Sequence, residues 1–118
     1  MDPRYQQIQT SFEERGWELA SASAEDLDWW ADEIWEFRSR WSPEGVPVFV
    51  TFLVDPQWEG DRVRRQGVWA VGSSASLPTN PAQAQENAVL RLKALGQEVG
   101  AFLDRVELLR SGAIDGRT

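Results

Sequence analysis

The sequence predicts a two-layer α+β protein, with an antiparallel meander sheet of three or four strands and two helices on one of its faces. Three observations favour this class. Near both ends of the chain, apolar residues recur at intervals of three and four, as they do on amphipathic helices. In the middle they alternate with polar residues, as in strands that bury one face. A turn sequence, Ser42-Pro43-Glu44-Gly45, separates two of the strand-like runs.

The chain has 118 residues, of which 42% are hydrophobic and 26% are charged. A protein of this length removes roughly two-thirds of its unfolded surface from water, so the apolar residues suffice for a packed core. We therefore expect a single domain over residues 1–118.

The N-terminal helix is expected over residues about 3–15. Asp2 is a suitable cap, and Pro3 fits the first helical position. The helical period then places three apolar side chains on one face, which are Tyr5, Ile8 and Phe12. After this helix, alternation predicts a strand at about 17–23.

The turn sets the expected register of a central hairpin with strands at about 29–41 and 46–55. On the face that we assign to the core, it pairs Phe37 with Val50 and Trp35 with Phe52. On the opposite, mixed face it pairs the residues Glu36 with Thr51, Ile34 with Leu53 and Asp32 with Asp55. A slip by one residue would exchange the two faces, so the apolar pattern supports this choice of inward side chains.

A further strand is expected at about 67–75, after a polar loop. Asn80 and Pro81 then predict the start of a long helix over about 81–110. Its apolar stripe steps regularly by three and four. Gly96 and Gly100 are the expected places for a kink or a close backbone contact, and the tail 112–118 is expected to be loose.

The composition restricts the possible functions. The chain contains neither histidine nor cysteine, so imidazole and thiol catalysis and most transition-metal sites are excluded. We expect no metal and no cofactor, and catalysis is the less favoured class. No apolar run is long enough to span a bilayer, and the N-terminus lacks a signal-peptide pattern, which predicts a soluble, cytoplasmic protein.

The charge balance argues against nucleic-acid and membrane binding. Twelve basic and 19 acidic residues give a net charge of −7, which repels a phosphate backbone. The order of helix, strands and helix is similar in outline to the double-stranded RNA-binding domain. However, the segment 80–86 at the start of the final helix carries no basic residue, so we infer no such function. Arg62, Arg64 and Arg65 are expected to form salt bridges within the fold.

The seven tryptophans divide into two groups. Trp35 and Trp41 belong to the expected core face, and Trp17 and Trp69 are expected to be buried as well. The other three form a possible ligand site beside several carboxylates, with a cation, an arginine-bearing peptide or a sugar as ligand, and they are Trp29, Trp30 and Trp58. The alternative, which we favour, is that these three indoles cover the end of the sheet.

Asp32 and Asp55 face each other in the expected register. Two carboxylates at that distance could share a proton, bind a divalent cation or act as acid and base. A solvated pair relieved by a nearby arginine is the simpler interpretation.

Ile34, Phe49 and Leu53 would form an apolar stripe on the mixed face of the sheet, as in a protein interface. The first hypothesis is therefore a non-catalytic protein-interaction module, a small acidic homodimer that binds a protein partner of its own, as an inhibitor, immunity protein or chaperone does. The second is a small-molecule or cation-binding domain, conceivably enzymatic, that uses Asp32 and Asp55 between tryptophan walls.

Overall fold

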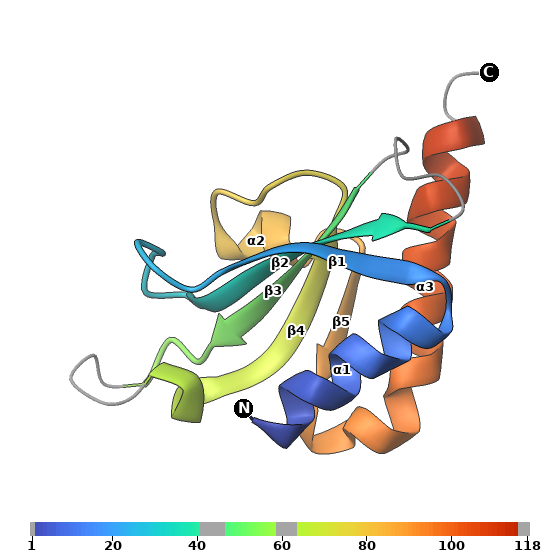
Figure 1. Cartoon of the computed structure of the whole chain (residues 1–118). Coiled ribbons are helices and arrows are strands. Elements are labelled where there is room, and N and C mark those ends of the chain that lie inside the picture. Colours follow the sequence, from blue (N-terminus) through green and yellow to red (C-terminus); the bar gives the residue numbers. More distant parts are fainter. Residues whose placement is uncertain (1, 41–46, 59–63, 116–118) are drawn as a thin grey trace.

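The structure is a computed structural model, and it describes residues 2–40, 47–58 and 64–115. Its elements follow the order α1 (Pro3–Glu14), β1 (Trp17–Ser23), β2 (Ala31–Ser39), β3 (Val48–Val54), η1 (Arg64–Gly67), β4 (Val68–Ser74), α2 (Pro81–Ala84), β5 (Ala88–Arg91), η2 (Leu92–Ala94) and α3 (Leu95–Asp115), where η marks a 3-10 turn. The strands form one antiparallel sheet in sequential order (Figure 1). The α+β class and the meander are confirmed, but the sheet has five strands rather than three or four.

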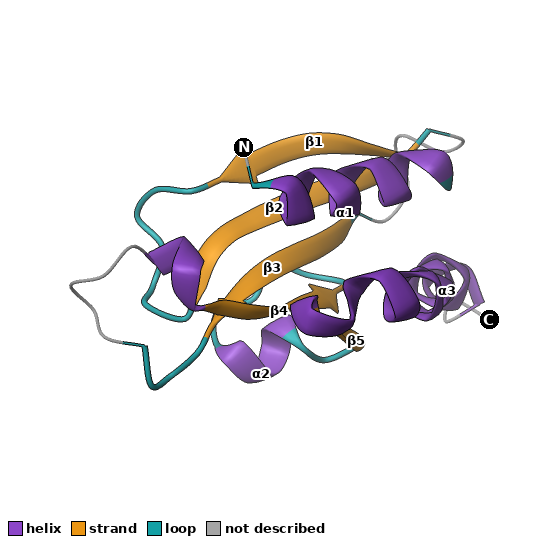
Figure 2. Ribbon diagram, turned by 90° about the horizontal axis from the view of Figure 1, so that it is seen from below, coloured by secondary structure: helices purple, strands orange, loops and turns teal. Residues whose placement is uncertain are grey.

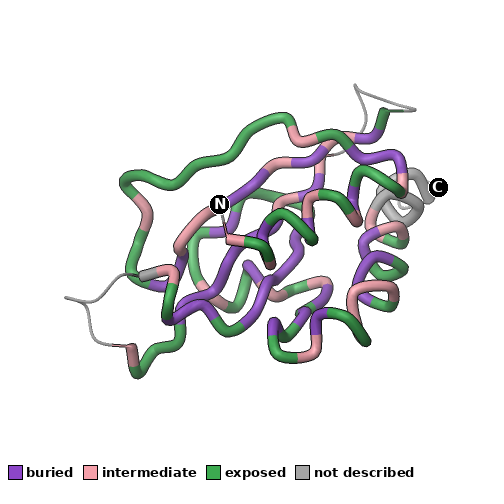
Figure 3. The backbone as a smooth tube through the Cα atoms, turned by 60° about the horizontal axis from the view of Figure 1, so that its bottom comes forward, coloured by how far each residue is buried: buried purple, intermediate pink, exposed green. Residues whose placement is uncertain are grey.

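Helices α1 and α3 cover the same face of the sheet (Figure 2). Between them and the strands lies the main core, in which aromatic rings pack in direct contact. Phe12 of α1 stacks on Phe37 of β2 with 4.1 Å between ring centroids, and Tyr5 stacks on Phe52 of β3 at 3.9 Å. The buried residues are concentrated in the central strands and in the parts of the helices that pack on them (Figure 3).

The other face of the sheet, the outer face, carries a second and smaller apolar cluster. Short helix α2 packs on it against β3 and β4. At the closest approach, a Cβ added to Gly72 of β4 would lie 2.2 Å from the Ala84 carbonyl oxygen, so only glycine fits under α2. The buried members of this cluster are Trp30, Ala31, Ile34, Leu53, Ala70 and Ala84.

The N-terminal helix agrees with its prediction. The Asp2 carboxylate accepts a hydrogen bond of 2.9 Å from the backbone N–H of Arg4, which caps the first turn. The three predicted apolar residues are all buried against the sheet. At the other end, Gly16 has a φ of 89°, a left-handed conformation that glycine adopts without strain, and β1 begins at the next residue.

The register of the β2–β3 hairpin differs from the prediction by two residues. Phe37 pairs with Val48 and Trp35 pairs with Val50, rather than with Val50 and Phe52. A shift of two preserves which side chains point inward, so the core face was predicted correctly while the cross-strand partners were wrong. The turn that set the predicted register, together with Trp41, lies outside the described residues.

A β-bulge interrupts β2 at Asp32. Ala31 pairs with Leu53, whereas Glu33 pairs with the adjacent Phe52, so Asp32 is an extra residue without a partner on β3. The insertion turns the Asp32 side chain to the side of α1, where it accepts a hydrogen bond from the Tyr5 hydroxyl. It also places Ala31 in the outer cluster.

The C-terminal third is not one helix. Asn80 caps α2 as predicted, since its side chain accepts a 2.8 Å hydrogen bond from Gln83 N, but α2 ends after one turn. Residues Ala88–Arg91 instead pair with β4 as the fifth strand. Ala88 and Leu92 fit a helical period, whereas Ala88, Leu90 and Leu92 fit a two-residue period, and pairing with the edge of β4 decides between the two.

Helix α3 runs without interruption through Gly96 and Gly100 and continues to Asp115. A Cβ added at either glycine would meet no atom within 4 Å, so neither marks a close backbone contact. The beginning of α3 lies at an angle to its later turns (Figures 1 and 2). The tail was predicted to begin at residue 112, but α3 extends to Asp115. Residues 116–118 lie outside the described part. Within the described residues, no helix combines the length and apolar character that crossing a membrane requires.

Two glycine substitutions should change stability in opposite directions. Gly100→Ala is expected to raise the free energy of unfolding by about 0.5–1 kcal/mol, because alanine is the better helix former and its methyl group meets open space. Gly72→Ala is expected to lower it by about 1–3 kcal/mol, because α2 must move away from β4. Urea unfolding followed by circular dichroism measures both. Equal midpoints for the two variants would contradict the placement of α2.

Candidate functional site

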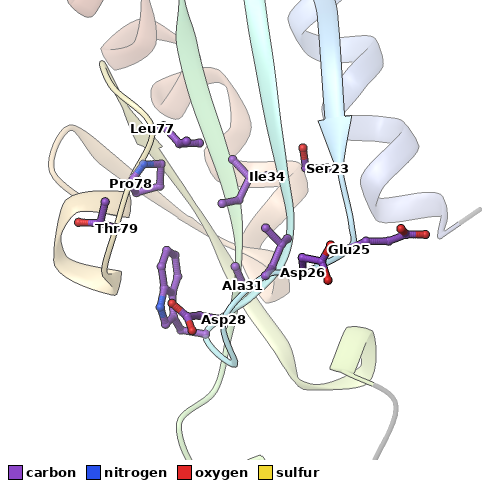
Figure 4. A pocket seen from close by; sticks show the side chains of 11 residues that line it. Ser23, Glu25, Asp26, Asp28, Ala31, Ile34, Leu77, Pro78 and Thr79 are labelled. Atoms are coloured by element: carbon purple, nitrogen blue, oxygen red, sulfur yellow. The ribbon is translucent and has the colours of Figure 1, made fainter.

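A groove on the outer face of the sheet is the strongest candidate site. Two adjoining hollows of about 380 Å³ and about 280 Å³ form it, and they share Ser23, Ile34 and Leu77. Ile34 of β2 and Phe49 of β3 provide an apolar floor. Figure 4 shows Ile34 between Ser23 on one side and Leu77 and Pro78 on the other. We call this hollow the outer groove.

The two walls of the outer groove come from segments that are far apart in the sequence. One wall is the end of β1 and the loop that follows it, where Asp26 has a positive φ of 59°. Such a conformation is uncommon for a residue other than glycine, although aspartate tolerates it. The other wall is the loop after β4, whose Leu77 leaves 60% of its surface exposed. An apolar side chain that projects so far into solvent is available for contact with a ligand.

The outer groove is acidic. Its lining contains four carboxylates, and none of its lining residues is basic. Glu36 is partly neutralised by Arg38 of the same strand at 2.8 Å. The remaining three acids are in the loop between β1 and β2, and they are Glu25, Asp26 and Asp28. Together with the net charge of −7, they favour a ligand with positive charge.

The shape of the outer groove suits an extended chain. Its lining follows β2 from Ala31 to Glu36, a length of roughly 17 Å at the rise of a β-strand. That length accommodates about five residues of an extended peptide.

The three tryptophans that we grouped as a possible ligand site do not come together. Trp29 is 55% exposed, and Trp30 lies in the outer cluster and lines the groove. Trp58 packs against the main core on the other face, where a Cβ added to Gly67 would lie only 2.4 Å from its ring. Of the three, the structure therefore places only Trp30 in the outer groove.

Asp32 and Asp55 are not opposite each other. Asp55 follows β3 and is exposed, and its carboxylate accepts a hydrogen bond of 2.8 Å from the backbone N–H of Gln57 in a turn. Asp32 occupies the bulge in β2 and points toward α1. The opposition followed from the predicted register, and the two-residue shift and the bulge together remove it.

Asp32 belongs instead to a polar cluster at the edge of the main core, which we call the Arg65 cluster. The Tyr5 hydroxyl donates to Asp32 at 2.7 Å, and the Trp35 indole N–H donates to Glu33 at 2.7 Å. Arg65 of η1 binds both carboxylates, and its guanidinium carbon lies 4.8 Å from the centre of the Tyr5 ring. Every polar side chain of the cluster thus has a partner within it.

The Arg65 cluster is a structural link rather than a reactive centre. Burial raises the pKa of the Tyr5 hydroxyl well above its usual value, and the hydrogen bond to Asp32 raises it further. Tyr5 therefore remains a proton donor at any physiological pH. One arginine joins the start of α1, the bulge of β2 and η1, which is the role we expected for the basic residues of this loop. Arg62 lies outside the described residues.

Only two of the three residues of the apolar stripe predicted on the outer face line the groove. Leu53 is only 2% exposed and is covered within the outer cluster, so it is not accessible to a partner. Ile34 and Phe49 line the groove. Sequence reasoning missed Leu77 and Pro78. The one available signal was an apolar pair within a run rich in serine and threonine.

The tryptophans predicted to be buried divide in a similar way. Trp17 and Trp35 lie in the main core as predicted, with exposures of 0% and 2%. Trp69 is 40% exposed, so its predicted burial was wrong.

Among the described residues, no group of three or more acidic side chains is arranged to hold a metal ion. No known protein family matches the chain, and no curated protein or solved structure is detectably similar to it.

The Arg65 cluster allows a test of its structural role. Tyr5→Phe removes the donor to Asp32 and is expected to lower the free energy of unfolding by about 1–3 kcal/mol, since a buried bond to a charged group is lost. Asp32→Asn keeps an acceptor for Tyr5 but loses the charge opposite Arg65. The Arg65 side chain is 40% exposed, so salt can screen its attraction to Asp32. In 1 M salt, where the screening length is about 3 Å, the loss of unfolding free energy in Asp32→Asn should therefore become smaller, while the loss in Tyr5→Phe should persist.

Urea unfolding at low and high salt measures both variants. An unchanged midpoint for Tyr5→Phe would contradict the role of this hydrogen bond.

Proposed function

We propose that this chain is a non-catalytic protein-interaction module that binds an extended segment of a partner protein in the outer groove. The segment carries basic side chains on either side of an apolar one. The observation that supports this most directly is the composition of the groove lining, with an apolar floor, four acids and no basic residue.

The apolar floor provides the anchor of the proposed contact. Ile34 is only 7% exposed, and both floor residues, Ile34 and Phe49, belong to strands of the sheet, which fix their positions. Leu77 is the exposed apolar side chain that a ligand would cover. Covering one leucine stabilises a complex by about 1.5–3 kcal/mol, which is enough to select an apolar residue at that position.

The acids determine the charge of the partner. Glu25 and Asp26 are exposed at the mouth of the groove, where rim charges act mainly on the rate of encounter and on the choice of partner. A basic segment is attracted by these residues and by the whole molecule, because both carry negative charge.

A catalytic function has less support. The chain has no histidine or cysteine, and the groove lining offers carboxylates and hydroxyls without a lysine or arginine beside them. The alternative site between Asp32 and Asp55 lacks the geometry on which it depended. The experiment below also separates a partner segment from a second copy of this chain as the occupant of the groove.

Fluorescent heptapeptides test the proposal. A peptide that alternates arginine and leucine is expected to bind at least tenfold more tightly than peptides that alternate arginine with serine or glutamate with leucine. Leu77→Ser should weaken this binding about tenfold. Its matched control is Leu108→Ser on α3, because Leu108 is 63% exposed but lies outside the groove.

Charge variants provide the second arm. Glu25→Gln is expected to weaken binding about twofold and to reduce its salt dependence, whereas Glu18→Gln on the exposed part of β1 should not. Equal affinities for the three peptides, or equal effects of Leu77→Ser and Leu108→Ser, would refute the proposal. A dimer in sedimentation that Leu77→Ser dissociates would assign the groove to a second copy instead.

A further inference from the structure

A bulge in β4 presents Trp69 to solvent. On β4, Ala70 pairs with Leu53 of β3 and Val68 pairs with the next residue, Val54, so Trp69 has no partner on β3. Its side chain is 40% exposed, although it lies in the run Val68–Val71 whose other members are buried. Bulges commonly turn a side chain away from its regular direction and occur near functional sites.

Trp69 forms one side of a pocket that shares no residue with the outer groove. The pocket has a volume of about 310 Å³, and Val68 and Leu92 contribute buried apolar surface to it. Its remaining lining residues are Arg91 and Lys93. This volume is at the lower end of the range for small-molecule sites, roughly 300–1,000 Å³.

The pocket is basic, although the protein is acidic. Lys93 is the only lysine of the chain, whose other basic residues are arginines. Arg91 donates to Glu98 of α3 at 2.8 Å, so its charge is largely balanced. Lys93 is exposed in the middle of η2. The net positive charge of the pocket therefore comes from the Lys93 ammonium group.

We infer that the Trp69 pocket binds a small planar aromatic anion, with its ring on the Trp69 indole and its carboxylate or phosphate at Lys93. Stacking on an indole favours a flat ring in an offset or edge-on arrangement. An ammonium group forms a charge-assisted hydrogen bond with an anion but has no preference for planar geometry, so it accepts either acid group. The inference is independent of the outer groove.

The single lysine allows a direct measurement. Reductive methylation with ¹³C-formaldehyde keeps the positive charge and labels Lys93 and the N-terminal amine, which two-dimensional NMR resolves. The probes are 2-naphthoate, 2-naphthyl phosphate and the neutral 2-naphthamide. We expect a saturable shift of the Lys93 methyl signal with at least one of the two anions, and binding at least fivefold weaker with the amide.

Variants connect the shift to the pocket. Since the NMR label is lost in Lys93→Met, ligand-detected saturation transfer measures all variants. Trp69→Ala and Lys93→Met should each weaken binding of the better anion at least fivefold. Arg38→Met removes a positive charge from β2, outside the pocket, and should leave the affinity unchanged.

Three results would overturn the inference. They are the absence of a saturable shift with either anion, equal binding of the amide, and equal effects of Lys93→Met and Arg38→Met in variants whose circular dichroism matches the parent. The comparison of carboxylate with phosphate identifies which anion the pocket prefers.

Discussion

The pairing of Leu53 determines how this sheet presents its side chains. Leu53 is the β3 residue at which both neighbouring strands carry a bulge, at Asp32 on β2 and at Trp69 on β4. Because side chains alternate along a strand, one inserted residue changes the direction of a neighbour. Leu53 itself is held in the outer cluster, at 2% exposure. The bulges at Asp32 and Trp69 thus lie on either side of the same buried residue, Leu53.

The two bulges have different consequences. The bulge at Asp32 supplies a carboxylate to the Arg65 cluster, where it connects α1 and η1 to the sheet. It also leaves Ala31 on the outer face, where its small side chain lines the groove without filling it. The bulge at Trp69 instead exposes an indole that lines a separate pocket with Leu92 and Lys93. An inserted residue thus gives a structural contact at Asp32 of β2 and an accessible aromatic surface at Trp69 of β4.

The sequence predicted the layers better than the details. Alternation determined which residues of β2 and β3 face the core, and this survived a two-residue error in register because a shift of two preserves the faces. The fifth strand was missed because Ala88 and Leu92 also fit the helical stripe, and only pairing with the edge of β4 selects the strand. The bulge at Asp32 left a faint signal, since two acids separate Ala31 from Ile34. Trp69 left none, because its neighbours are all apolar.

The outer groove and the Trp69 pocket depend on the same net charge in opposite ways. At the outer groove, the local acids and the field of the whole molecule attract the same cationic segment, so electrostatic attraction contributes to encounter as well as to binding. At the Trp69 pocket, the field of a chain with net charge −7 opposes the approach of an anion that Lys93 attracts locally. Because one ammonium group at an exposed position contributes up to about 1 kcal/mol, which is about the fivefold effect expected for Lys93, the rest of the binding energy at this pocket must come from contact with the indole. A ligand at this pocket therefore requires both the exposed ring of Trp69 and the charge of Lys93.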